Sequence, residues 1–466
     1  MGVYLVLLVG GTTALINAAS TCAAWPACGN GWVIPGTVNG LIAVGHRATA
    51  FVVGLMVVAS AVLAWRESRQ PRVKWALAVS ALLYPFQAAL GAVIATRPAT
   101  NELIAGHVVL GLSIFAGLVA ALAWTLEAET GDPDDRPISD PTDPAVSTDS
   151  AESPAAAVSP ATDSSDAGSR PSVPQETVPR LKATAFAYFR LMKPRLMWLL
   201  CLVAAAAMAL AGGPGFDVPT VLATLGGGVL SIGASGTFNH VFERDIDRKM
   251  NRTSDRPLAV DLVPVRHALA FGILLSTASL ALFASVNILT AVLGLTAIVF
   301  YSVVYTLLLK PNTVQNTVIG GAAGALPALI GWVAVTGSVG VGGLLLAGVI
   351  FLWTPAHFYN LAIAYKDDYE RGGFPMMPVV RGETETRKHI LWYLGATFVA
   401  AGLLAVTTSL DWLYVATSVI AGGLFLWTVV RLHYEQTESA AFRAFHASNV
   451  YLGLLLLAVL VDAVVV

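Results

Sequence analysis

The sequence predicts an all-α integral membrane protein in which a four-helix transmembrane bundle precedes a nine-helix one. Three observations predict this class. The chain of 466 residues is 56% hydrophobic and only 12% charged, with a mean hydropathy of +0.70, which is not the balance of a soluble globular protein. Apolar runs of roughly 18–24 residues recur, each long enough to cross a bilayer as a helix. A polar, acidic stretch between residues 127 and 180 divides these runs into two groups.

About thirteen apolar runs qualify as membrane helices by length. The first has no basic start, unlike a signal peptide, and leads directly into a loop with Cys22 and Cys28, so we interpret it as a retained helix. Four runs precede residue 127, at roughly 3–20, 41–65, 74–95 and 102–126. Nine follow residue 195, at roughly 196–213, 218–241, 264–285, 287–309, 314–336, 341–362, 388–409, 412–431 and 447–465.

The stretch 127–180 is rich in Asp, Ser, Pro, Thr and Ala and has almost no aromatic residues. Such a segment cannot bury enough apolar surface to offset the entropy lost on ordering, so we predict a disordered acidic linker. It separates a small membrane domain, residues 1–126, from a large one, residues 181–466.

The basic residues predict the orientation of the helices in the cell membrane. The loops between alternate helices near 213–217, 286, 337–341 and 409–411 hold no Lys or Arg. We therefore expect the N-terminus, the linker and the charged loops in the cytoplasm and the Cys22–Cys28 loop outside. We expect no nucleic-acid partner for this membrane protein. The loops that hold nearly all Lys and Arg residues are 66–74, 190–195, 244–256, 310, 366–388 and 431–443.

The segment NHVFERDIDRKMNRTSDRPL, residues 239–258, concentrates charge of both signs at the cytoplasmic end of a helix. Asn239, Glu243 and Asp247 are spaced i, i+4, i+8, so they share one face if the helix continues, and Asp245 lies off that face. Oxygen ligands of this kind suit Mg²⁺, which fills its other sites with water and phosphate oxygens. The cations that follow match phosphate oxygens, so the segment predicts a diphosphate site. These cations are Arg248, Lys249, Arg252 and Arg256.

A second charged loop, YKDDYERGGFPMMPVVRG, follows another apolar helix on the same expected side. Its Asp367 and Asp368 could hold metal ions on the other side of the same diphosphate. A solvated loop that only sets topology is the alternative for both segments. The helices beneath carry polar groups, which line a cavity or make interhelical hydrogen bonds. These groups are Gln315, Asn316, His357 and Asn360.

The pattern NxxxExxxD followed by RKMNRTSDRPL resembles the first signature of the UbiA superfamily of intramembrane prenyltransferases, and most closely its haem O synthase subfamily. Three more segments, LMKPRLMWLL, YTLLLKPNTVQNTVIGGAAGALPALIGW and WTPAHFYNLAIAYKDDYERGGFPMMPVV, are similar to that subfamily. The resemblance covers about residues 186–466. Glu243 stands where most members have Asp. Asp368 lacks a second acid four residues away, where Ala364 and Gly372 stand.

The resemblance implies transfer of a farnesyl group from farnesyl diphosphate to a vinyl group of haem B, with Mg²⁺ as cofactor. It implies that Tyr305 and Tyr365, or Tyr301 and Trp332, stabilise an allylic cation, and that His357 orients haem. The implied metal ligands are Asn239, Glu243, Asp247, Asp367 and Asp368, of which all but Asp367 are also assigned to catalysis. The implied diphosphate contacts are Lys193, Arg195, Arg248, Arg252, Lys310 and Arg381.

The small domain has its own candidate groups. Cys22 and Cys28 can form a disulfide in the outward loop. His46 and His107 lie near the outward ends of the second and fourth helices, where facing histidines would ligate haem or remain satisfied polar residues. The segments GHRATA, QAALGAVIATRP and AGHVVLG resemble half of haem A synthase. This resemblance implies a bound haem and either self-association or pairing with a haem A synthase.

Three other functions stay open at this point. A UbiA-type enzyme could prenylate a quinone or a lipid instead of haem. The chain could be a haem-binding protein of oxidase assembly, in which only the small domain matters. A transporter would show paired repeats with helices broken at the membrane midplane, whereas the acids here stand at helix ends on one side.

Overall fold

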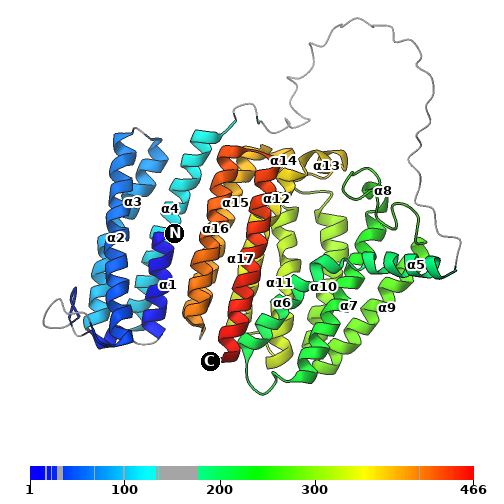
Figure 1. Cartoon of the computed structure of the whole chain (residues 1–466), viewed down its shortest axis with the longest axis horizontal. Helices are drawn as coiled ribbons and strands as arrows, with labels where there is room; N and C mark the ends of the chain where they lie inside the picture. The colour runs from blue at the N-terminus through cyan, green and yellow to red at the C-terminus, as the bar shows by residue number, and fades with distance from the viewer. Residues whose placement is uncertain are drawn as a thin grey trace, which may run out of the picture.

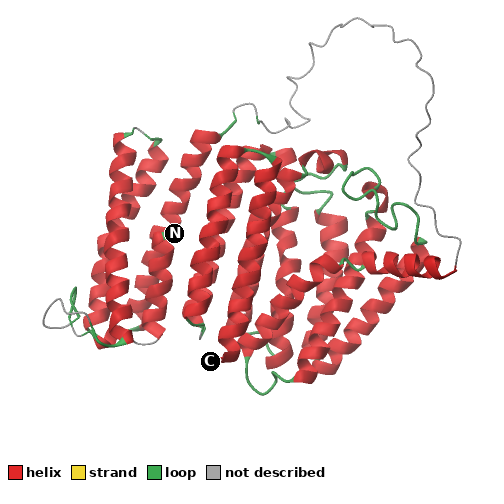
Figure 2. Cartoon of the chain, viewed as in Figure 1, coloured by secondary structure: helices red, strands yellow, loops and turns green. Residues whose placement is uncertain are grey.

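The computed structural model describes residues 1–15, 18–22, 24–28, 35–67, 69–97, 100–132, 135, 177–408 and 410–465. Every regular element in these ranges is a helix (Figure 2). Among these described residues, twelve helices are long and apolar enough to span a membrane, three of them before residue 131 and nine after residue 193. The chain is therefore a multi-pass membrane protein, with the nine-helix count expected for its second part.

The first bundle is built from four α-helices and one short 3₁₀ turn. Thr37 and Thr100 cap the second and fourth α-helices, since their hydroxyls accept hydrogen bonds from the Gly40 and Leu103 amides at 3.2 and 3.5 Å. The elements are α1 (Gly2–Leu15), η1 (Ala18–Thr21), α2 (Val38–Arg66), α3 (Pro71–Thr96) and α4 (Asn101–Thr130).

Only part of the expected span at residues 3–20 is described, and that part is shorter than a membrane crossing. Helix α1 has 14 residues, which at about 1.5 Å per residue reach roughly 21 Å, less than the hydrocarbon core of about 30 Å. It starts partway along the bundle rather than at the expected cytoplasmic end (Figure 1).

The second bundle contains nine spans, with short helices between some of them. Asp217 and Asn287 cap two of the spans by accepting hydrogen bonds from the Thr220 and Thr290 amides, each at 2.8 Å. The elements are α5 (Thr177–Leu191), α6 (Pro194–Ala211), α7 (Val218–Phe242), α8 (Arg244–Asp247), α9 (Val265–Val286), α10 (Ile288–Val299), the π-helix η2 (Phe300–Leu309), α11 (Asn316–Thr336), α12 (Val341–Ala364), α13 (Lys366–Arg371), α14 (Met377–Val380), α15 (Gly382–Thr407), α16 (Trp412–Glu435) and α17 (Glu438–Val465).

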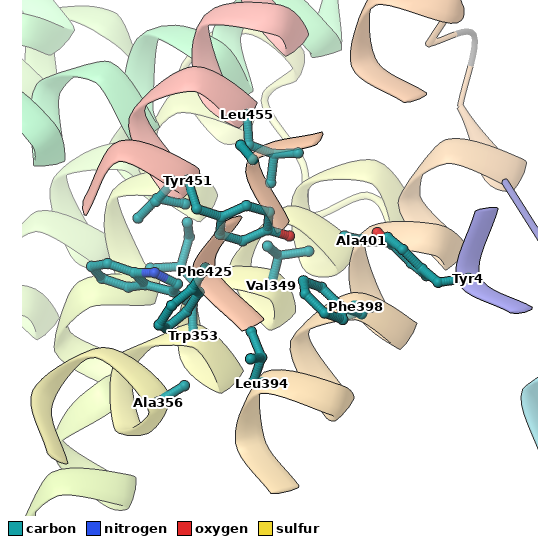
Figure 3. Close-up of a cluster of buried hydrophobic side chains, with 14 of the residues drawn as sticks. Tyr4, Val349, Trp353, Ala356, Leu394, Phe398, Ala401, Phe425, Tyr451 and Leu455 are labelled. Atoms are coloured by element: carbon teal, nitrogen blue, oxygen red, sulfur yellow. The ribbon is translucent and has the colours of Figure 1, made fainter. Parts of the chain in front are cut away.

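The two bundles share an apolar core. Tyr4 of α1 stacks on Phe398 of α15, with ring centroids 4.8 Å apart, and its hydroxyl is 2.6 Å from the Ser418 hydroxyl of α16. Figure 3 shows Tyr4 pointing at Phe398 across this contact, with Tyr451 beyond it. Near the N-terminal end of α15, Lys388 pairs with Glu127 of α4 at 2.9 Å. The first bundle thus packs directly against α15 and α16.

The expected linker is only partly described. Helix α4 continues to Thr130 and α5 begins at Thr177, while residues 136–176 lie outside the described ranges. The short helices α8, α13 and α14 gather at one end of the molecule, and segment 18–28 lies at the opposite end (Figure 1). This placement brings both charged loops to the same side.

Candidate active site

The acidic face expected from the sequence forms where α7 ends. Helix α7 stops at Phe242, but the Glu243 and Asp247 amides still donate to the Asn239 and Glu243 carbonyls at 2.9 and 2.8 Å. These two hydrogen bonds continue the helical spacing through α8, so Asn239, Glu243 and Asp247 lie on one face. All three side chains are buried, with exposed fractions of 2%, 4% and 2%.

Three cations cover this face, and we call the six residues together the charged cluster. Lys310 donates to Glu243 at 2.6 Å, and Arg256 donates to both Asp247 carboxylate oxygens at 2.8 Å. Arg256 also lies 3.8 Å from Glu243, and Lys193 donates to the Asn239 side-chain oxygen. Because three cationic side chains face two carboxylates, the cluster has an excess of positive charge that suits an added anion.

Burial and mutual charge shift the ionisation of the cluster. Burial lowers the pKa of Lys193 to about 7, and nearby Arg256 acts in the same direction. Burial raises the pKa of Asp247 above its usual value despite Arg256. Burial also acts to raise the pKa of Glu243, but Lys310 and Lys193 outweigh it and hold that pKa below its usual value. Shifted values of this kind gather at functional sites.

The backbone around Lys193 is strained. Lys193 joins α5 to α6 with a φ of 56°, a left-handed conformation that is costly for a residue with a Cβ. The turn lies against Gly236 of α7, where a Cβ would come within 2.9 Å of the Leu191 carbonyl oxygen. The missing side chain at Gly236 thus lets the turn approach α7 and place the Lys193 ammonium beside Asn239.

The π-helix η2 supplies the other wall of the cluster. The Lys310 amide bonds to the Tyr305 carbonyl at 2.9 Å, and the Thr306 hydroxyl donates to the Tyr301 carbonyl at 2.8 Å. In an α-helix the nine residue steps from Tyr301 to Lys310 make about two and a half turns and would put the two residues on opposite sides. The wider i→i+5 turns bring both to the cluster, where the Tyr301 hydroxyl is 3.2 Å from Lys193. Sequence reasoning missed η2 and the hydrogen bond from Asn239 to Thr306, 3.1 Å long.

The prediction that Asp367 and Asp368 join the acids of the first loop around a metal stays a prediction, since Asp368 has other partners in this structure. Asp368 accepts hydrogen bonds from the Asn251 and Arg252 amides at 3.2 and 2.9 Å and pairs with Arg371. Its lone pairs are used to hold the two loops together, and Asp367 is exposed. In the described part of the chain, no group of three or more His, Cys, Asp or Glu side chains could hold a metal ion.

Several expected diphosphate contacts lie elsewhere. Arg248 pairs with the exposed Asp261 at 2.7 Å, so Arg256 occupies the place expected for Arg248. Arg195 and Arg381 are exposed. Arg252 lies over the Tyr365 and Tyr369 rings, at 5.0 and 5.4 Å from their centroids. Only the fold of the loop after α8 decides which arginine reaches the carboxylates.

The expected aromatic and haem-orienting residues have different partners. Tyr305 lies beside the cluster, with its ring centroid 5.5 Å from that of Tyr301. His357 of α12 bonds through Nδ1 to the Ser448 hydroxyl of α17 at 2.6 Å and stacks on Trp353, with centroids 4.2 Å apart. These contacts make His357 part of the α12–α17 packing, which was the alternative to a haem role.

An apolar pocket opens beside the cluster. It lies between α6, α7, α9, α10 and α11 and has an empty volume of about 710 Å³, its open mouth included. Lys193 and Tyr301 line both the pocket and the cluster, so the charged groups stand at one end of an apolar space. Sequence reasoning did not identify the other residues of its wall, which include Cys201, Gly228, Phe283 and Ile330.

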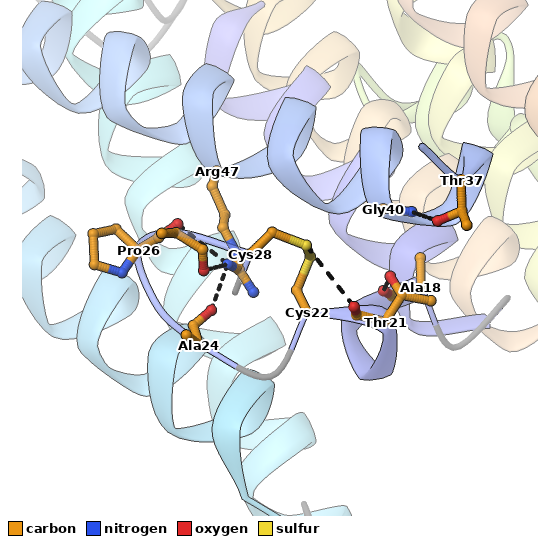
Figure 4. Close-up of a disulfide and its surroundings, with 10 residues drawn as sticks. Ala18, Thr21, Cys22, Ala24, Pro26, Cys28, Thr37, Gly40 and Arg47 are labelled. Atoms are coloured by element: carbon orange, nitrogen blue, oxygen red, sulfur yellow. Dashed lines mark hydrogen bonds between the residues drawn. A yellow bond between two sulfur atoms is a disulfide. The ribbon is translucent and has the colours of Figure 1, made fainter. Parts of the chain in front are cut away.

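The first bundle holds the second group of candidate residues. Cys22 and Cys28 form a disulfide, and Arg47 of α2 donates to the Ala24 and Ala27 carbonyls of that loop, each at 2.8 Å (Figure 4). His107 lies 3.2 Å from Gln87. Within the described ranges, the buried Nδ1 atoms of the His46 and His107 rings have no hydrogen-bond partner.

The fold and the charged cluster define an intramembrane prenyltransferase. The model of the UbiA prenyltransferase family matches residues 199–453, and the chain belongs to this family. The digeranylgeranylglyceryl phosphate synthase structure covers 61% of this chain and 100% of its own at a TM-score of 0.52 and 17% identity, which supports the fold alone. A second model, described as a cytochrome oxidase assembly protein, matches residues 38–146.

Curated relatives narrow the class further. The chain is 62% identical to the protoheme IX farnesyltransferase of Haloarcula marismortui over 464 residues, 99% of this chain and 96% of that one. It is also 62% identical to protoheme IX farnesyltransferase 1 of Natronomonas pharaonis, over 100% of this chain and 97% of the relative. A shorter relative, protoheme IX farnesyltransferase 1 of Saccharopolyspora erythraea, is 47% identical and aligns with 63% of this chain and 94% of its own.

Proposed function

We propose that the chain transfers the farnesyl group of farnesyl diphosphate to a vinyl group of haem B, giving haem O and releasing diphosphate. The observation that carries the proposal is a cation-rich cluster at one end of an apolar pocket within a UbiA fold. The full-length similarity to protoheme IX farnesyltransferases supports haem B as the acceptor over a quinone or a lipid.

The charged cluster binds the diphosphate in this proposal. Lys193, Arg256 and Lys310 already converge on buried oxygens at hydrogen-bond distance, so an anionic group that enters there is met by three donors. The cations stabilise the negative charge that grows on the departing diphosphate, and this electrostatic effect is aimed at the transition state. Arg248 is not part of this set, because it faces Asp261.

The residues present also fit a magnesium ion. Mg²⁺ is held by one or two carboxylates and completes its shell with water and phosphate oxygens, which needs no cluster of three acids. Glu243, Asp247 and the amide oxygen of Asn239 would hold it, and they share one buried face. The bound ion would neutralise charge on the diphosphate.

The apolar pocket holds the isoprenoid chain and keeps water from the allylic carbon. Tyr301 lines the pocket, its hydroxyl lies 3.2 Å from Lys193 of the cluster, and the Tyr305 ring centroid is 5.5 Å from the Tyr301 ring centroid. A tyrosine ring attracts cations through its face, and Lys193 already lies 5.4 Å from the Tyr301 centroid. Tyr301 therefore stabilises the developing allylic cation where the diphosphate leaves.

The test compares two acids of the same loop. Membranes containing the chain are incubated with haem B, farnesyl diphosphate and Mg²⁺, and the pigment is identified by mass. Asp247→Asn should lower haem O formation by about 100-fold or more, because it removes a buried charge from the cluster. Asp245→Asn should change it little, because Asp245 is exposed, with 74% of its side chain accessible. Equal losses in both variants, or a prenylated quinone as the only product, would refute the proposal.

We also propose that the first bundle binds a haem through His46 and His107. Their buried nitrogens without partners support this role, as does the match to an oxidase assembly family. The purified protein should show an absorption spectrum of six-coordinate haem that is lost in His46→Ala and kept in His267→Ala. A spectrum unchanged by His46→Ala would exclude this ligand.

A further inference from the structure

The apolar pocket has a definite far end. Its wall follows α7 from Gly236 beside the charged cluster to Thr224, twelve residues deeper, which at about 1.5 Å per residue is roughly 18 Å. Phe283, in the last turn of α9, lines the pocket at this depth and is completely buried. An aromatic ring thus lines the deep end of the pocket, together with the smaller side chain of Thr224.

The Phe283 ring is held between two glycines. A Cβ on Gly227 of α7 would come within 2.7 Å of the ring, and one on Gly294 of α10 would come within 2.3 Å. Next to this contact, the Ser279 hydroxyl of α9 donates to the Gly227 carbonyl at 2.7 Å, which ties α9 to α7. A ring enclosed on both sides by helix backbone cannot swing aside without moving α7 or α10.

The space next to Gly228, between Phe283 and the charged cluster, is open. Gly228 lines the same pocket, four residues from Thr224 in the direction of the charged cluster. A Cβ added to Gly228 would meet nothing within 4 Å. A side chain at this position would therefore extend into the pocket instead of colliding with a neighbouring helix. Gly228 offers a means of shortening the pocket without disturbing the seat of Phe283.

We propose that Phe283, seated between Gly227 and Gly294, sets the length of isoprenoid that the pocket accepts. This inference rests on the proposed function and adds the residue that limits the donor to a C15 chain. A donor one isoprene unit longer would have to displace the ring, whereas a shorter donor would leave apolar volume unfilled. Both lose binding energy, because van der Waals contact is lost when packing is either strained or incomplete.

The test uses one variant that lengthens the pocket and one that shortens it, and it measures which isoprenoid donor each variant prefers. Membranes with haem B and Mg²⁺ receive equimolar geranyl (C10), farnesyl (C15) and geranylgeranyl (C20) diphosphates, and the prenylated haems are quantified by mass. Phe283→Ala should raise the ratio of C20 to C15 product by about tenfold or more. Gly228→Leu should raise the ratio of C10 to C15 product by a similar factor and suppress the C20 product.

A control variant and a second pocket variant make the result of this test interpretable. Phe271→Ala is the matched control, because Phe271 lies in the same helix but packs its ring on Tyr188, with centroids 5.0 Å apart, and it should leave the ratios unchanged. Gly228→Leu tests the pocket even if Phe283→Ala fails to fold. Unchanged ratios in Gly228→Leu, or in a folded Phe283→Ala, in a chain that makes haem O would overturn the inference alone. Absence of any prenylated haem from the unaltered chain would overturn the proposed function and the inference with it.

Discussion

Arg256 and Arg248 lie eight residues apart in one loop, and their replacement by glutamine should have very different effects. Arg256 makes two hydrogen bonds of 2.8 Å to Asp247, whose side chain is 3% exposed, and lies 3.8 Å from Glu243. Hydrogen bonds to charged groups contribute about 1.5–3 kcal/mol each, and removing one partner of a buried ion pair costs about 3–5 kcal/mol.

Part of that cost is offset, because Lys310 and Lys193 remain beside the carboxylates. A net loss of about 3 kcal/mol is left, and it corresponds to a decrease in kcat/KM of roughly 150-fold for Arg256→Gln. Arg248 and its partner Asp261 have side chains that are 39% and 73% exposed. An exposed pair contributes at most about 1 kcal/mol, so Arg248→Gln should lower kcat/KM by no more than about fivefold.

The assay measures initial rates of haem O formation against farnesyl diphosphate concentration, in membranes that contain equal amounts of each variant. Arg256→Lys should fall between the unaltered chain and Arg256→Gln, because it retains the charge but loses the two-pronged contact with Asp247. Equal losses in Arg248→Gln and Arg256→Gln would refute the role assigned to Arg256, since only its position separates it from Arg248.

Three more expectations follow from the structure. Burial lowers the pKa of Lys193 to about 7, so its ammonium loses its proton as pH rises and kcat/KM should fall through about pH 7. Lys193→Arg should remove this fall. The same pH profile in both proteins would contradict the role of Lys193. Cleavage at a protease site inserted between residues 150 and 151 should give two fragments that purify together. Tyr4→Ala should separate these fragments, because a buried large-to-small change costs about 3–5 kcal/mol. Joint purification of the Tyr4→Ala fragments would show that this contact is dispensable. A cysteine in place of exposed Asp245 should react with a membrane-impermeant reagent only from the cytoplasmic side, and a cysteine in place of exposed Ser338 only from outside. Labelling of both cysteines from the same side would contradict the expected orientation.

The helical spacing of Asn239, Glu243 and Asp247 was sufficient to predict one shared face, because two hydrogen bonds continue the helix past Phe242. The identity of the arginine that meets this face was not predictable in the same way. Arg248 and Arg256 have the same chemistry, and the turns between them carry Arg256 back over the carboxylates. The same loop brings the Asn251 and Arg252 amides to Asp368, which gives that carboxylate partners other than the expected metal.

Composition and residue order alone establish the membrane class, the nine spans of the second part and the gathering of charge at helix ends, because the bilayer imposes length and polarity on each segment separately. Contacts between distant segments decide the rest. The π-helix that carries Lys310, the left-handed turn at Lys193 and the glycine seat of Phe283 each lie in contact with another helix. Such features arise from packing between residues far apart in the chain, which no local pattern records.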